Sequence, residues 1–126
     1  MTAPHLRDRY LQDSISTASP AKLLLMLYDR LVLDLIKGED ALRGGAREEA
    51  HERLTHAQEI VLELRTSLDV DAWSGAPALA NLYGWMLTEL IGANIGKDAD
   101  RVAACRTLVE PLRDAWREAA AAAVAG

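Results

Sequence analysis

The residues best suited to chemistry in this chain are two histidines, His51 and His56, within the stretch HERLTH. An exposed histidine on a helical bundle can accept a phosphoryl group. Here Glu48, Glu49 and Glu52 surround the pair, and their negative charge disfavours an incoming phosphoryl group. No Lys-Gly pair follows either histidine, as we would expect at a phosphotransfer site. We therefore interpret both as solvated surface histidines.

Metal binding and nucleophilic catalysis fail on the number of suitable residues. Glu48 and His51 have the Glu-x-x-His spacing of di-iron bundles, but such a site needs a second motif, and His5 is the only histidine left. Cys105 falls on an apolar stripe, and the chain has neither a Gly-x-Ser-x-Gly elbow nor a phosphate-binding loop. We expect no catalytic residue, no metal and no cofactor, and hence a protein that is not an enzyme.

Composition limits the chain to one domain of ordinary globular type. At 126 residues, 50% hydrophobic and 26% charged, the chain can bury one sizeable core. The net charge of −5 and the lack of a basic stripe argue against binding of nucleic acid or an anionic membrane. A single cysteine cannot form an internal disulfide, and the start MTAPHLRDRY lacks the apolar region of a signal peptide. We expect a cytoplasmic protein.

Four apolar-periodic segments, separated by turn residues, predict an all-α protein built as an antiparallel up-down four-helix bundle. No alternating strand pattern or hairpin turn interrupts them. The expected bundle covers residues 19–121, with helices at about 20–43, 46–68, 77–95 and 98–121. Residues 1–18 form an extended N-terminal arm that can pack over the bundle, and residues 122–126 form a frayed tail.

Three local signals refine this prediction. Ser19 before Pro20 marks a helix start, because serine caps free backbone N–H groups and proline lacks one. Pro111 lies inside the fourth apolar pattern, and its missing N–H predicts a kink or a local break near residues 107–111. Trp73, in the loop DVDAWSGAP, is either a loop plug or exposed, and we expect the plug because large apolar rings rarely stay in water.

The first helix carries more apolar surface than one bundle face requires. Eleven of the fourteen residues 23–36 are apolar or aromatic, in a run that is too short and too often interrupted by charges to span a membrane. On a helical wheel the charged residues, Asp34 among them, share one arc, and Leu33 also falls there. Either this helix is central in the bundle, or the N-terminal arm or a partner helix covers it.

Several motifs recur in the order typical of a known family. The most specific are Thr17-Ala18-Ser19-Pro20, Met26-Leu27-Tyr28-Asp29, the helix end Leu64-Arg65 with Ser67-Leu68-Asp69, and Leu82-Tyr83 with Ala93-Asn94. With these motifs the chain, from about Tyr10 to Trp116, resembles the FliS family of flagellar secretion chaperones, which bind flagellin before export. The chain departs from the family at Arg30, at Ala21-Lys22 and in the loop around Trp73.

The resemblance implies a four-helix bundle that binds the disordered C-terminal segment of cytosolic flagellin. This chaperone would prevent premature polymerisation and aid flagellar type III export, with export apparatus components as further partners. The N-terminal arm would cover part of the binding surface and yield to flagellin, and the protein would be a monomer or weak homodimer. The alternative is a four-helix adaptor for another secreted or regulatory protein.

The resemblance also implies which residues take part in binding. Tyr10 and Ile15 would belong to the arm. The motif positions that could line or support the groove are Leu24, Leu27, Tyr28, Leu64, Leu68, Leu82, Tyr83 and Met86. For most of these, core packing is the alternative role. A partner lying across the bundle as amphipathic helices would enter grooves between the helices.

Overall fold

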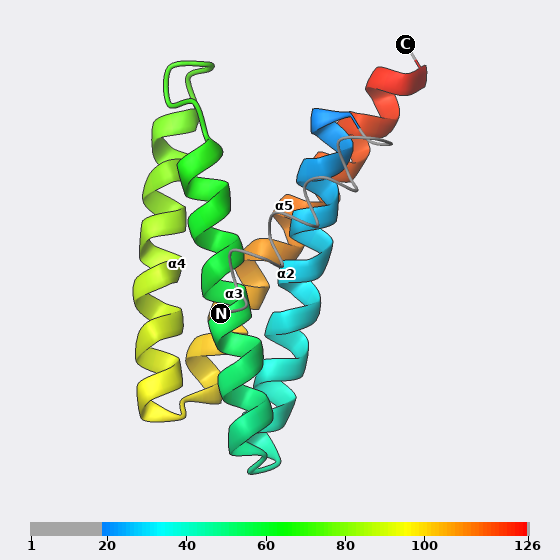
Figure 1. Cartoon of the computed structure of the whole chain (residues 1–126). Helices are drawn as coiled ribbons and strands as arrows, with labels where there is room; N and C mark the ends of the chain where they lie inside the picture. Colours follow the sequence, from blue (N-terminus) through cyan, green and yellow to red (C-terminus); the bar gives the residue numbers. More distant parts are fainter. Residues whose placement is uncertain (1–18, 126) are drawn as a thin grey trace.

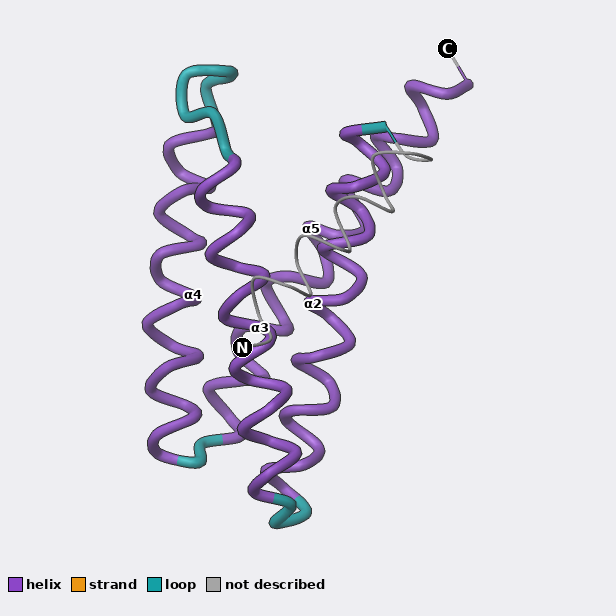
Figure 2. Tube along the Cα trace, in the orientation of Figure 1, coloured by secondary structure: helices purple, strands orange, loops and turns teal. Residues whose placement is uncertain are grey.

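The computed structural model describes residues 19–125, which form four helices in a bundle (Figure 1). The helices are α2 (Pro20–Arg43), α3 (Arg47–Ser67), α4 (Ala76–Gly96) and α5 (Ala99–Ala125). α2 packs against α3 and α5, and α4 packs against the same two helices, so the four surround one core. The described residues contain no strand (Figure 2), and the predicted all-α four-helix bundle is confirmed.

Local sequence explains where the helices begin and end. The side-chain oxygen of Ser19 accepts a hydrogen bond from the backbone N–H of Lys22 at 3.2 Å, and Pro20 occupies the first helical position. The turn into α3 uses Gly45 at φ 76°, a backbone conformation that favours glycine. α4 ends on Lys97 in the left-handed conformation, with its N–H bonded to the carbonyl of Ala93.

α5 runs without a break through Pro111. Of the two predicted outcomes, a kink or a local break, the break is therefore absent. Both Pro111 and Thr107 are exposed, so water can hydrate the Thr107 carbonyl that loses its backbone N–H partner. The helix continues to Ala125, into the segment that we expected to be frayed.

α2 provides much of the core but is not a central helix. Tyr28, Leu31 and Leu35 are fully buried, while Leu33 and Ile36 on the outer side each keep 38% of their surface exposed. Its main packing partners are two, α3 and α5, as for each of the other helices. None of the four described helices has both the length and the apolar character required to cross a bilayer.

Asp34 corrects the expectation that all charges of α2 share a solvent-facing arc. Its side chain is only 1% exposed and accepts a hydrogen bond from Nη1 of Arg53 at 3.2 Å. The other carboxylate oxygen contacts Nδ1 of His56, and Nε of Arg30 lies 3.7 Å from the oxygen that Arg53 contacts. A buried carboxylate is tolerated only when it is paired. These contacts therefore fix α2 against α3.

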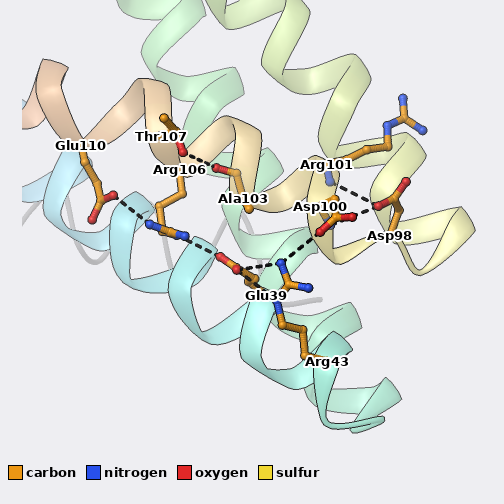
Figure 3. A network of polar contacts seen from close by, with 9 residues as sticks. All are labelled: Glu39, Arg43, Asp98, Asp100, Arg101, Ala103, Arg106, Thr107 and Glu110. Carbon is orange, nitrogen blue, oxygen red and sulfur yellow. Dashed lines mark hydrogen bonds and ion pairs between the residues drawn. The ribbon is translucent and has the colours of Figure 1, made fainter.

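Glu39 provides the corresponding link between α2 and α5 (Figure 3). Its carboxylate accepts hydrogen bonds from Nε of Arg106 at 2.9 Å and from Nη2 of Arg43 at 3.1 Å. Arg106 also pairs with Glu110, and Arg43 with Asp100, so the network continues along α5. Burial raises the pKa of Glu39, but the two arginines together lower it further, and the net pKa lies below its usual value.

Removing the Asp34 carboxylate should weaken the bundle strongly. We expect Asp34→Ala to lower the free energy of unfolding by about 2 kcal/mol, because Arg53 and His56 lose the charged acceptor that joins them to α2. Urea unfolding measures this loss. Asp40→Ala, at an exposed position of the same helix, is the control and should change stability by less than about 0.5 kcal/mol. Equal losses in the two variants would contradict the role given to Asp34.

The stability contributed by Glu39 should depend on pH. Because folding lowers the pKa of Glu39, its contribution is present above the usual value of 4.5 and is lost as pH falls through the folded-state pKa. Wild type should therefore have a higher urea midpoint than Glu39→Gln at neutral pH, and the difference should shrink in acid. A difference that is constant across this range would exclude the carboxylate charge as its cause.

Candidate functional site

The two helix pairs α2–α5 and α3–α4 diverge toward the end of the bundle that carries residues 68–75 (Figures 1 and 2). Neighbouring helices are antiparallel, so this end gathers the N-terminal parts of α2 and α4 and the C-terminal parts of α3 and α5. We call it the splayed end: residues 20–28, 64–86 and 108–119. All candidate residues that the structure describes lie within it.

Five of the candidate residues form the floor of the splayed end. They are buried in the core: Leu27, Tyr28, Leu64, Tyr83 and Met86. The hydroxyls of Tyr28 and Tyr83 hydrogen-bond to each other at 2.5 Å across the core, and burial raises the pKa of both phenols. Both rings therefore stay neutral at physiological pH and tie α2 to α4. The floor supports a binding surface without itself being accessible.

Three candidate residues are only partly buried: Leu24 on α2, Leu68 at the end of α3 and Leu82 on α4. Each packs against the core while part of its side chain remains accessible. They come from three segments that lie at the same end of the bundle. Of the residues selected from the sequence, these are the ones that a partner can touch. Tyr10 and Ile15 lie outside the described residues.

An aromatic chain that sequence reasoning missed runs across the splayed end. Trp73 of the loop meets Trp116 of α5 edge-on, with ring centroids 6.4 Å apart. Trp116 in turn lies 6.4 Å from the ring of Tyr28, which bonds to Tyr83. The available signal was Trp116, the only aromatic residue on the fourth apolar stripe. Trp73 is 49% exposed, so the prediction that its ring plugs the loop is wrong, although the ring contacts Trp116.

Two further exposed apolar side chains lie at matching levels of α4 and α5. The guanidinium of Arg101 lies over Gly92, which fixes the level of α5 against α4. Seven residues, or two helical turns, separate Arg101 from Leu108, and seven separate Gly92 from Trp85. The antiparallel register therefore brings Trp85 and Leu108, which are 41% and 42% exposed, to the same level.

The two histidines and the cysteine first considered for chemistry lie outside the splayed end, and each is either hydrogen-bonded or buried. Nδ2 of Asn94 donates a hydrogen bond to Nδ1 of His51 at 3.1 Å, and His56 contacts the buried Asp34. Burial raises the pKa of Cys105 to about 12, so its thiol is unreactive at neutral pH. No group of three or more metal-ligating side chains occurs among the described residues. The site is apolar, and it suits binding better than catalysis.

Comparison with known proteins identifies the family. The family model described as "Flagellar protein FliS" matches residues 2–123. The flagellar secretion chaperone FliS of Bacillus subtilis is 33% identical over 110 residues, which cover 87% of this chain and 82% of that protein. The protein of the same name from Vibrio cholerae is 29% identical over 84% of this chain and 79% of its own length.

A solved structure supports the same fold. It is a crystal structure of a bacterial flagellar chaperone with a TM-score of 0.73 and 24% identity, covering 91% of this chain and 94% of that one. The family model extends over nearly the whole chain, and the curated relatives match it over most of their own length. The chain belongs to the FliS family of flagellar secretion chaperones.

Proposed function

We propose that this chaperone acts in the cytoplasm by binding the C-terminal segment of flagellin at the splayed end. Binding holds flagellin unpolymerised until the flagellar type III export apparatus receives it. The observation that carries this proposal is the partly buried apolar surface of Leu24, Leu68 and Leu82 above a fixed floor. The family is one of chaperones, so the mechanism is binding and release without turnover.

The shape of the splayed end suits a helical client. Partly buried leucines from α2, α3 and α4 present separate apolar contacts around the ends of the helices. An amphipathic client helix offers anchors at i, i+3 or i+4 and i+7, which can fit between such contacts. Ordering a disordered segment is unfavourable, and a large apolar contact area offsets that loss. The surface therefore selects for apolar periodicity in the client and requires no charged anchor.

The rigidity of the floor favours tight binding. Tyr28 and Tyr83 are held by their mutual hydrogen bond, and neither is accessible to the client. A surface whose support does not rearrange loses less conformational entropy on association than a mobile one. Most of the conformational entropy lost on binding is then lost by the client.

The client assignment is tested by calorimetric titration with unpolymerised flagellin and, in parallel, with flagellin lacking its C-terminal segment. We expect saturable binding with a negative heat-capacity change to the first, because apolar surface is buried, and no binding to the second. Absence of binding to both would sink the flagellin assignment and leave an adaptor for another secreted or regulatory protein, to be found by co-purification. Equal binding to both would move the client site to another part of flagellin.

The contact surface is tested by single substitutions at the accessible leucines. Leu24→Ala, Leu68→Ala and Leu82→Ala should each weaken flagellin binding roughly fivefold or more, because each removes accessible apolar contact area from the proposed surface. Ile95→Ala is the matched control, since Ile95 is 80% exposed at the opposite end of α4, and its affinity should stay within about twofold. Urea unfolding verifies that all four variants are folded. Unchanged affinity in all three leucine variants would place the client elsewhere.

A further inference from the structure

The loop that carries Trp73 is bonded mainly to itself. The backbone N–H of Ala72 donates to the carbonyl of Asp69 at 3.1 Å, and that of Asp71 donates to the Asp69 carboxylate at 3.0 Å. The N–H of Ala76 closes the loop on the carbonyl of Trp73 at 3.1 Å. These hydrogen bonds stay within the loop and its junction with α4. The Trp73 ring is therefore the loop's principal link to α5.

Gly75 is what allows the ring to fold back. A Cβ atom on Gly75 would lie 1.9 Å from the Trp73 ring, far inside contact distance, so any side chain there would displace the indole. The backbone of Gly75 itself is ordinary, with φ −85° and ψ −9°. Alanine therefore fits the backbone at this position, and the position of the Trp73 ring is the feature that it disturbs.

The ring in turn covers surface at the splayed end. Trp73 meets Trp116 at an interplanar angle of 90°, while about half of its own surface remains in water. Trp116 is partly buried against the core, beside Leu112 on the same stripe of α5. Moving Trp73 away exposes apolar surface to water, which is unfavourable unless another apolar group takes its place. The Trp73 ring therefore stays on Trp116 in the free protein, and another apolar group can replace it there.

We propose that Trp73 is a hinged cover over a subsite on Trp116, and that a bulky apolar side chain of the client displaces it. The subsite already accommodates an indole edge-on, which indicates the size and chemistry of the group it accepts. It adjoins the floor, since the Tyr28 ring also lies 6.4 Å from Trp116, centroid to centroid. This inference rests on the proposed function and adds a competition between loop and client at that same site.

The experiment compares Gly75→Ala and Trp73→Ala with wild type, using calorimetric titration with unpolymerised flagellin. Both variants remove the cover, one by steric displacement and one by deletion, so both should bind about two- to tenfold more tightly. Gly96→Ala is the matched control, because a Cβ at Gly96 meets nothing within 4 Å, and it should bind as wild type does. Weaker or unchanged binding by both variants would overturn the proposal. Weaker binding would show that Trp73 is itself a client contact.

A spectroscopic readout follows the ring directly. The chaperone is labelled with 5-fluorotryptophan, and the three ¹⁹F resonances are assigned with single Trp→Phe variants. The Trp73 resonance should move when flagellin is added, toward its position in free Gly75→Ala. Binding by calorimetry with no movement of this resonance would refute the cover and leave the proposed function standing. Failure of wild type to bind flagellin at all would instead overturn the proposed function, and the subsite with it.

Discussion

The rotation of α2 about its own axis is the constraint on which the rest of the structure depends. Asp34 and Glu39 are five residues apart, which places them about 140° apart around the helix. One is paired with Arg53 and His56 of α3, and the other with Arg106 of α5. With both carboxylates held, α2 turns its apolar side into the core. That rotation brings the Tyr28 hydroxyl to Tyr83 on the opposite helix.

At the splayed end, apolar side chains next to this fixed core are partly exposed to solvent. The helix pairs diverge there, and several apolar side chains that pack against the core remain partly accessible. The phenol pair keeps the floor fixed, and the Trp73 ring lies over Trp116 at the margin. A bundle of this kind can expose an apolar surface without losing its core, because the burial that stabilises it continues below the surface. That combination is what a binding protein for an apolar segment requires.

The sequence predicts the bundle well because its signals are local. Ser19 and Pro20 begin α2 as expected, and Gly45 permits the turn that connects α2 to α3. The helical wheel placed Asp34 on the solvent-facing arc because a charged side chain is expected in water unless its partners are known. Its partners lie on another helix, α3. The break at Pro111 does not occur because the affected carbonyl faces water, which a linear pattern does not reveal.

The candidate leucines and tyrosines follow from the family motifs, but only packing separates the buried floor from the accessible residues. The aromatic chain joins four separate segments, and no periodicity within one segment could indicate it.

The most direct test of the account is amide hydrogen exchange of the full-length chaperone, alone and saturated with unpolymerised flagellin. The account predicts new protection in the segments that form the splayed end, residues 20–28, 64–86 and 108–119. The turn at residues 44–46 at the opposite end should exchange equally in both states. Protection concentrated at that turn, with the splayed end unchanged, would contradict the account and place the client on the other end of the bundle.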